Sequence, residues 1–257
     1  MTINYTHCEI ENICVASEFD FDAKGRLLLF VGHAHSGHSL IGALLDAHPD
    51  VCLTNEVNVV KLIQQYQLNK EQIEKVLFHA YASNQIGWKN SAYKYNLKGG
   101  FQGMSDKPEV LGDKKAGGST RIIFNHPEVY DDILKLYGDR LRVIYVERNP
   151  LDVVAAYSYY MQQEPSLFHV NRYNENKAVV EAIQLKTPAK QWLTIKQNAF
   201  VNEPYNQLMS AYDFIGVSTG ALITQIQDWV SVVKSDIKGK SESIEINDNL
   251  KALINYN

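Results

Sequence analysis

The segment FVGHAHSGHSLIGALLDAHPD, residues 30–50, limits the fold more than any other part of the sequence. Residues 27–31 (LLLFV) form a short apolar run, as expected for a buried parallel strand that enters a loop. Apolar residues then recur at 40, 41, 44 and 45 on one helical face between Ser39 and His48, and Pro49 ends the pattern. The sequence therefore predicts a strand, a loop containing glycine, and a helix in direct succession.

The loop in this unit, Gly32–Ser39, reads GHAHSGHS. It fits the phosphate-binding template G-x-x-x-x-G-K-[ST] at every fixed place except one, where His38 replaces lysine. Backbone N–H groups of such a loop, together with the helix N-terminus, bind phosphate without needing any side chain. We therefore predict an anion site whose ligand residues are His33, Ala34, His35, Ser36, Gly37, His38 and Ser39.

Four of the eight histidines lie at 33, 35, 38 and 48, so a metal site has to be weighed. A loop that enters a helix does not place His35 and His38 on one helical face, and no clustered Asp or Cys completes a ligand set. No metal is therefore predicted. We interpret His48, just before Pro49, as a helix-end residue with local hydrogen bonds.

A second buried strand is predicted at 142–146 (RVIYV), and Asn149 or Pro150 should open the helix that follows. A phosphotransferase using ATP and Mg²⁺ would need a lysine at position 38 and an acidic residue at the end of this strand. Arg148 stands there instead, and its guanidinium suits an anion better than a metal ion. Positions 38 and 148 therefore both argue against an ATP-dependent phosphotransferase, but this alternative stays open.

The alternation of strands and helices predicts an α/β fold, a P-loop-type parallel sheet flanked by helices with a mostly helical C-terminal half. We expect a single domain over residues 1–257, with residues 1–25 as an N-terminal extension packed on it. Asn69 and Gln72 form a capping pair at the start of one helix. The helical patterns cover 57–66, 70–82, 151–162, 175–185, 205–214, 219–233 and 248–255.

Composition narrows the class of protein. Hydrophobic residues make up 45% and charged residues 21%, which are ordinary globular values, and a net charge of −4 gives no reason to expect nucleic acid. Three cysteines without C-x-x-C spacing indicate neither a disulfide framework nor a zinc ribbon. No apolar run approaches the roughly 20 residues of a membrane span, and the N-terminus lacks the regions of a signal peptide. We expect a soluble, cytoplasmic protein.

Four segments occur in an order that is typical of one family. Residues 32–40 are similar to the motif G-x-x-[RK]-S-G-[TS]-[TS]-L and continue into LLDAHPDV, and VIYVERNPLDVVAA is similar to strand-x-R-[ND]-P-x-D-x-x-x-S. GDKKAGG at 112–118 is like a G-[DE]-K-x-P segment, and FVNEPYNQLMSAYDFIGV at 200–217 is like a late segment. The set resembles the PAPS-dependent sulfotransferase family, with bacterial and tyrosylprotein-type members closest in motif.

This resemblance implies binding of 3′-phosphoadenosine 5′-phosphosulfate (PAPS) and transfer of its sulfuryl group to a hydroxyl or amine, with PAP as product and no metal. The backbone of residues 35–39 would cradle the phosphosulfate, and Arg148 would contact the 3′-phosphate. Glu56 stands where tyrosylprotein-type enzymes have their base. Lys114 matches the lysine that stabilises charge during transfer, with Lys115 as the fallback.

Each of these roles has a structural alternative. Glu56 could be a carboxylate placed at a helix N-terminus, where the dipole favours it. Arg148 could form a salt bridge at the edge of the sheet, and Lys114 could be a solvated loop lysine. These alternatives stay open on the sequence alone.

Several positions depart from the family pattern. His35 replaces Arg or Lys and His38 replaces Thr or Ser; His35 is kept as a catalytic candidate, because an anion beside it favours the imidazolium. Donor binding should therefore weaken above about pH 7. Ala156 replaces a serine, and Ser158 is the remaining donor-binding candidate, although it lies about 200° round the helix. Residues 238–240 (KGK) match the family's basic loop only weakly.

The acceptor is left open among a small molecule, a saccharide and a peptide. Aromatic residues gather after the second motif, which suits a sugar or a phenol, although aromatic residues at helical spacing more often belong to the core. A non-catalytic nucleotide-binding protein that kept the fold is a further alternative. No nucleic acid partner is expected, and oligomer formation is left open. The aromatic residues are Tyr157, Tyr159, Tyr160, Phe168 and Tyr173.

Overall fold

The structure is a computed structural model that describes residues 5–22, 24–83, 95, 97–105, 107–236 and 244–254. Its centre is a five-stranded sheet whose neighbouring strands all run parallel. The strand order is β2-β3-β1-β4-β5, so β1 is central and β3 lies between β1 and β2. The strands are β1 (Arg26–Val31), β2 (Val51–Asn55), β3 (Val110–Lys114), β4 (Leu141–Glu147) and β5 (Trp192–Lys196).

The sheet is apolar on both faces, because alternate side chains of a strand point to opposite sides. Leu27, Leu29 and Val31 belong to one core cluster, whereas Leu28 and Phe30 belong to another. A strand that is buried on both faces has a continuous apolar sequence, and the run LLLFV has this property.

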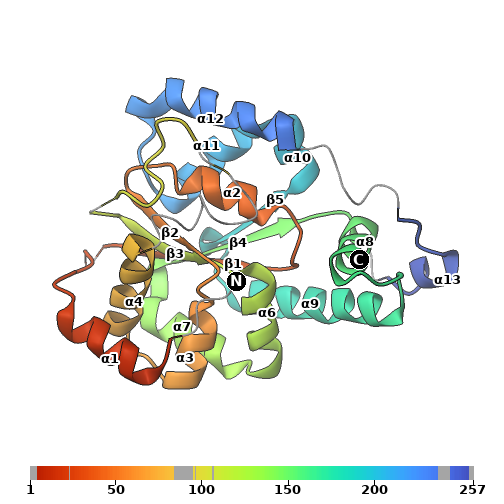
Figure 1. Ribbon diagram of the computed structural model, residues 1–257, viewed down its shortest axis with the longest axis horizontal. Coiled ribbons are helices and arrows are strands. Elements are labelled where there is room, and N and C mark those ends of the chain that lie inside the picture. The colour runs from red at the N-terminus through yellow and green to blue at the C-terminus, as the bar shows by residue number, and fades with distance from the viewer. Residues whose placement is uncertain are drawn as a thin grey trace.

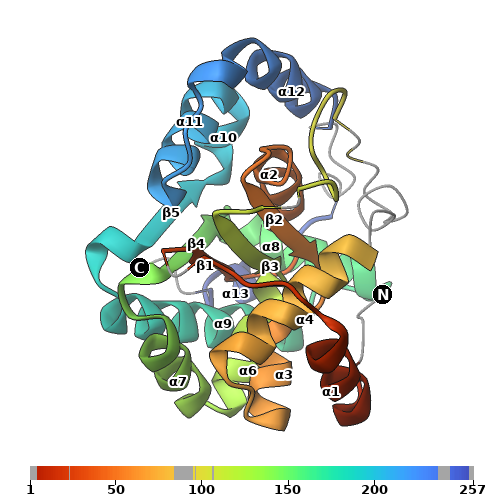
Figure 2. The ribbon, with the colours of Figure 1, turned by 90° about the vertical axis from the view of Figure 1, so that its left-hand side faces the viewer.

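Helices cover both faces of the sheet (Figures 1 and 2). One layer packs on the face of Leu28 and Phe30 and consists of α2 (His38–Leu45), α10 (Gln197–Asn202), α11 (Pro204–Ile215) and α12 (Ile223–Asp236). The other layer consists of α1 (His7–Ala16), α3 (Val59–Tyr66), α4 (Lys70–Ser83), α6 (Ala116–Asn125), α7 (Glu128–Tyr137) and α9 (Leu167–Lys186). At one end of the molecule, a third cluster joins α9 to α8 (Pro150–Met161) and the segment of α13 (Asp248–Lys251).

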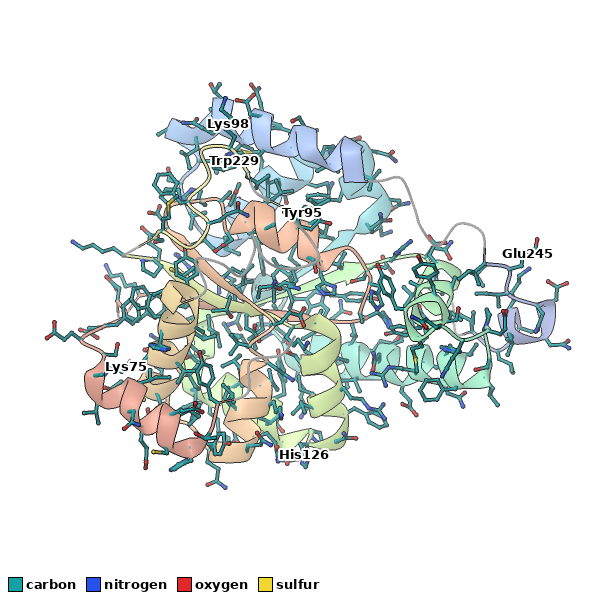
Figure 3. The ribbon with its side chains drawn as sticks, viewed as in Figure 1. Lys75, Tyr95, Lys98, His126, Trp229 and Glu245 are labelled. Atoms are coloured by element: carbon teal, nitrogen blue, oxygen red, sulfur yellow. The ribbon has the colours of Figure 1, made fainter. Side chains whose placement is uncertain are left out.

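Contacts with side chains labelled in Figure 3 tie outer segments to the two layers. Lys75 on α4 donates a hydrogen bond to the Cys14 carbonyl of α1 at 3.1 Å, which holds the N-terminal helix on α4. Trp229 on α12 is buried, and its indole N–H donates to the Lys98 carbonyl at 3.1 Å. No helix among the described residues is both long enough and apolar enough to cross a membrane.

The fold class and several predicted elements are confirmed. The strands at 27–31 and 142–146 lie within β1 and β4, and Asn149 caps α8, which begins at Pro150. The Asn69 and Gln72 side chains each accept a hydrogen bond from the other residue's backbone N–H, at 3.0 Å. The helices predicted at 57–66, 70–82, 151–162 and 205–214 correspond to α3, α4, α8 and α11.

Other boundaries differ from the prediction. The helix after the glycine loop, α2, ends at Leu45 instead of His48, and α9 begins at Leu167 and not at 175. The helix predicted at 248–255 is only four residues long in α13. The helix predicted at 219–233 opens with a 3-10 turn, Gly220–Leu222, before α12. Residues 238–240 lie outside the described residues, and the assignment of the whole chain to one domain stays a prediction.

The sequence did not predict β2, β3 or β5, nor the helices α1, α6, α7 and α10. The most consequential omission is β3, which passes through the segment GDKKAGG and is buried along its whole length. Gly112 allows β3 to lie close against β1, because any residue with a Cβ atom at this position would place that atom 2.5 Å from the Leu28 carbonyl oxygen. Glycine in this segment therefore marks close strand packing.

Candidate active site

The loops that follow β1, β2, β3 and β4 meet at one edge of the sheet, because parallel strands bring their carboxyl ends together. The glycine loop follows β1, Glu56 follows β2, Lys114 ends β3 and Arg148 follows β4. Four candidate regions that are far apart in the sequence therefore share one edge.

The loop after β1 has the geometry of an anion site. Gly37 is the N-cap of α2 with φ 95°, in the left-handed region that favours glycine, and no side chain of the described residues caps this helix. Backbone N–H groups of the first turn are therefore open to an external acceptor at the positive end of the helix dipole. The residues of the loop fit a phosphate or phosphosulfate group.

Helix α6 supports this loop from the side. The Gly32 N–H donates to the Thr120 hydroxyl at 2.7 Å, and Thr120 in turn donates to the Ala116 carbonyl at 2.9 Å. A Cβ atom on Gly117 would lie only 2.7 Å from the Ala34 nitrogen, so glycine lets the start of α6 approach the loop backbone. The position of the loop thus depends on a segment that the sequence did not predict to be helical.

Beside the loop, Glu56, Lys114 and Ser39 form a continuous chain of hydrogen bonds. Lys114 Nζ donates to Glu56 Oε1 at 2.6 Å and to Ser39 Oγ at 2.9 Å, and Lys115 Nζ donates to Glu56 Oε2. The Lys114 side chain is 1% exposed, and those of Lys115 and Glu56 are 20% and 26% exposed. The structure thus brings the predicted base, the predicted cation and the phosphate loop into contact.

The charges of this cluster set the protonation of Glu56. Burial by itself would raise the pKa of Glu56, but the charge of Lys114 and the hydrogen bonds from Lys114 and Lys115 lower it to about 2. Burial also lowers the pKa of Lys114, against the effect of Glu56. Glu56 is therefore a carboxylate at neutral pH, and its basicity would increase if the lysines moved toward another anion.

His33 enters the loop with its side chain turned into the protein. The ring is fully buried and stacks on Tyr173, with centroids 4.4 Å apart, and its Nδ1 lies 3.4 Å from the Tyr157 hydroxyl. Burial, and then the charge of Lys177, lowers its pKa to about 3. His33 therefore belongs to the loop through its backbone.

His35 and His38 lie closer to the reactive cluster. The His35 ring stacks on Tyr160 with centroids 3.9 Å apart, and burial followed by the charge of Arg148 lowers its pKa to about 4. His38 Nδ1 lies 3.1 Å from Ser36 Oγ, and burial lowers the His38 pKa well below its usual value. Both rings are neutral at pH 7 in the protein without donor.

Arg148 reaches the loop directly. Its Nη1 donates to the His35 carbonyl at 2.8 Å, and its Nε lies 3.6 Å from Asp152 Oδ2. The salt bridge considered as an alternative is therefore present, together with a bond to the loop backbone. Ser158, by contrast, is fully buried in α8 and donates to the Ala155 carbonyl at 2.9 Å, so its hydroxyl is engaged within its own helix.

The sequence did not single out Asp113, although this residue is central to the geometry. Its buried carboxylate accepts hydrogen bonds from the Thr54 hydroxyl at 3.1 Å and from the backbone N–H groups of Val57 and Val59 at 3.2 and 2.9 Å. Burial raises its pKa to about 6. The available signal was an acidic residue next to the candidate Lys114.

Two other features of the described residues bear on the choice of ligand. No group of three or more His, Cys, Asp or Glu residues among them could hold a metal ion. A cavity of about 920 Å³ lies at the opposite, amino-terminal edge of the sheet, lined by residues 17–22, 24–26, Phe78 and 107–109. It is remote from the phosphate loop and contributes nothing to this site.

Comparison with known proteins gives a consistent family and fold. Residues 28–220 match the model of a family described as the sulfotransferase family, whereas no curated protein matches the chain. The sulfotransferase domain of the Synechococcus PCC 7002 olefin synthase is similar, with a TM-score of 0.53 and 13% identity over 92% of this chain and 97% of that one. The sulfotransferase domain from the curacin biosynthetic pathway gives 0.54 and 12%, over 89% and 95%. A sulfotransferase from Alicyclobacillus acidocaldarius gives 0.50 and 15%, over 90% of each chain.

Proposed function

The chain belongs to the sulfotransferase family, and on this basis we propose that it transfers the sulfuryl group of PAPS to a hydroxyl or amine of an acceptor. The observation that carries the proposal is the contact of Glu56 with Lys114, and of Lys114 with Ser39 of the phosphate loop. A base and a cation would then lie beside the group to be transferred. A metal-free reaction in the cytoplasm is part of the proposal.

The donor would supply an activated sulfuryl group, and residues of this chain would bind it and move the proton. Glu56 would take the proton of the acceptor hydroxyl as the new S–O bond forms. The bond between sulfur and the bridging oxygen breaks, and its electron pair stays on the 5′-phosphate of PAP. Lys114 would stabilise the charge that develops on the bridging oxygen. The proton thus ends on Glu56 and the sulfuryl group on the acceptor.

Donor binding would use the loop and Arg148. The first-turn N–H groups of α2 and the loop backbone from residues 33–39 would hold the phosphosulfate. Arg148 would contact the 3′-phosphate while keeping its bond to the His35 carbonyl, which would link the two ends of the donor. Ser158 is the weakest member of the proposed set, because its hydroxyl already donates to Ala155.

The acceptor would lie beside His35, where exposed apolar side chains gather. Tyr160, which stacks on the His35 ring, is 52% exposed, and other large apolar side chains at the end of α8 and the start of α9 are exposed as well. This surface supports an acceptor with an aromatic or apolar part among small molecules, saccharides and peptides. The other exposed members are Tyr159, Met161, Leu167 and Phe168.

Calorimetric titration of the purified protein with PAP, and with ATP in the presence and absence of Mg²⁺, tests the donor. Micromolar PAP affinity that is lost in Arg148→Ala would support the proposal. ATP binding that requires Mg²⁺ would instead favour a phosphotransferase. PAP binding with no transfer in a broad acceptor screen, for the native protein as for Glu56→Ala, would favour a non-catalytic nucleotide-binding protein. Absence of PAP binding between pH 6 and 8 would contradict the proposal.

A further inference from the structure

Asp113 has no part in the proposed transfer, yet it is a fully buried carboxylate next to the reactive Lys114. Its carboxylate accepts hydrogen bonds from three residues between the end of β2 and the start of α3. Oδ1 accepts from Thr54 and Val57, and Oδ2 accepts from Val59, the first residue of α3. One carboxylate on β3 therefore organises the bend that contains Glu56.

This bend has an unfavourable backbone. Glu56 has φ 70° and Asn58 has φ 60°, so two residues with side chains occupy the left-handed region within three positions. Such conformations persist only where the surrounding structure enforces them. Asn58 is the N-cap of α3, but its side chain makes no capping hydrogen bond. Asp113, which lies on the neighbouring strand β3, caps α3 instead, because its carboxylate accepts a hydrogen bond from the Val59 N–H.

The position of Asp113 in β3 explains how it acts on Glu56. Neighbouring residues of a strand point to opposite faces, so Asp113 lies on the face covered by α3 and Lys114 on the face covered by α2. Asn55, the last residue of β2, pairs with Lys114 across the strands. Asp113 thus fixes the chain that carries Glu56 from one face, while Lys114 binds the Glu56 carboxylate from the other.

We propose that Asp113 is a positioning residue that holds the 55–58 bend in its left-handed form and thereby keeps Glu56 against Lys114. This inference rests on the proposed function, in which Glu56 is the base. Asp113 does not touch the transferred group. It acts through the backbone of residues 57 and 59.

The test compares the native protein with Asp113→Asn, which has the same shape but presents an N–H₂ group to one of the two backbone N–H donors. The readout is the titration of Glu56, followed by ¹³C NMR of protein labelled at glutamate carboxyl carbons and assigned with Glu56→Gln. In the native protein the Glu56 signal should not titrate above pH 4, since its pKa is about 2. In Asp113→Asn the pKa should rise by about one unit or more, toward the ordinary value, because the Glu56 carboxylate moves away from the lysines. The charge of Asp113 does not offset this rise, since its own pKa of about 6 leaves it protonated in the range where Glu56 titrates.

Asn58→Gly provides a second-site rescue, because glycine adopts φ 60° without the cost that asparagine bears. The double variant with Asp113→Asn should recover part of the native Glu56 titration. A merely structural role of Asp113 would lower stability without moving the Glu56 pKa. An unchanged Glu56 titration in folded Asp113→Asn would therefore overturn the inference.

Two measurements keep the result interpretable. If Asp113→Asn does not fold, Thr54→Val removes the hydroxyl that Asp113 Oδ1 shares with the Gly112 carbonyl, and it should raise the Glu56 pKa by a smaller amount; no rise there would also overturn the inference. PAP affinity, measured in parallel, should stay within about threefold of native in Asp113→Asn, because the loop is intact. Failure of the native protein to bind PAP would contradict the proposed function and leave the Glu56 result standing.

Discussion

Lys115 and Glu56 form an ion pair across the edge of the sheet, on the side of the carboxylate opposite Lys114. Lys115 is the residue at the N-cap position of α6, and Glu56 follows β2, so the pair links the segments that follow two separate strands. Lys115 is the more exposed of the two lysines. Glu56 is thus held between an inner cation and an outer one, and this arrangement makes its contribution to stability depend on pH.

Glu56→Gln should destabilise the protein at pH 7 by about 3 kcal/mol, because it leaves the buried Lys114 without its counter-charge. The folded pKa of about 2 lies below the ordinary value of 4.5, so the ionised carboxylate stabilises fully above pH 4.5. This stabilisation is lost as the pH falls toward 2, and the two proteins should converge. Urea unfolding at several pH values between 7 and 3 measures the difference.

The matched control for this series is Glu11→Gln on α1, where the carboxylate is 60% exposed and lies 3.2 Å from His7 Nε2 of the same helix. Its effect at pH 7 should stay below about 0.5 kcal/mol. A Glu56→Gln effect of the same small size would show that the buried pair contributes little.

Arg148→Ala should weaken PAP binding by about tenfold to a hundredfold, since it removes a charged donor from the proposed 3′-phosphate site and frees the His35 carbonyl. Arg148→Lys should recover only part of the affinity, because lysine keeps the charge but not the planar fork. Isothermal titration measures both, with the surface variant Lys190→Ala as control. Equal affinities for Arg148→Ala and Lys190→Ala would exclude Arg148 from the donor site.

The histidine loop should make PAP binding depend on pH. His35 has a pKa of about 4 without ligand, and a bound anion would raise it, so binding takes up a proton. Affinity should therefore fall as the pH rises from the free to the bound pKa. Burial sets the lower end of this pH range at about 4, whereas the sequence suggested that binding weakens only above about pH 7. Titrations between pH 5 and 8 should show a slope that is smaller in His35→Gln, and identical slopes would rule out His35 as its source.

Gly117→Ala should displace the phosphate loop, because the added methyl group would meet the Ala34 backbone at 2.7 Å. We expect a loss of about 1–3 kcal/mol in unfolding free energy and weaker PAP binding. Thermal unfolding and calorimetry check the two effects. Gly220→Ala is the control, because a Cβ there meets no atom within 4 Å; a comparable loss in this variant would mean that crowding at the loop is not the cause.

The sequence predicted the parts of the site that have a local signature. The glycine loop follows an apolar run, Arg148 follows a second one, and Glu56 and Lys114 came from a family resemblance. The fold class followed from the same alternation. Local pattern could not reveal that β3 enters the sheet between β1 and β2, because its five residues, VLGDK, carry glycine and two charges. Only tertiary packing makes this segment a buried strand.

The same limit applies to Asp113, Lys115 and the histidines. The role of Asp113 depends on backbone donors in a bend that is more than fifty positions away in the sequence. The pairing of Lys115 with Glu56 spans a comparable separation. The inward turn of His33 toward Tyr173 depends on α9, whose start the sequence placed too late. Contacts of this kind leave no periodic or spacing signal.

The place of β3 in the strand order has a consequence for how the chain acquires its reactive centre. The glycine loop and Glu56 are synthesised before β3, yet Lys114 must insert between their strands to reach Ser39 and Glu56, over separations of 75 and 58 positions. Such long-range strand pairing is slow compared with helix formation, because the entropy of closing the intervening loop opposes it. A nascent or partly folded chain would therefore lack both this lysine and the α6 segment that supports the anion loop, and the complete centre would appear only once β3 has entered the sheet.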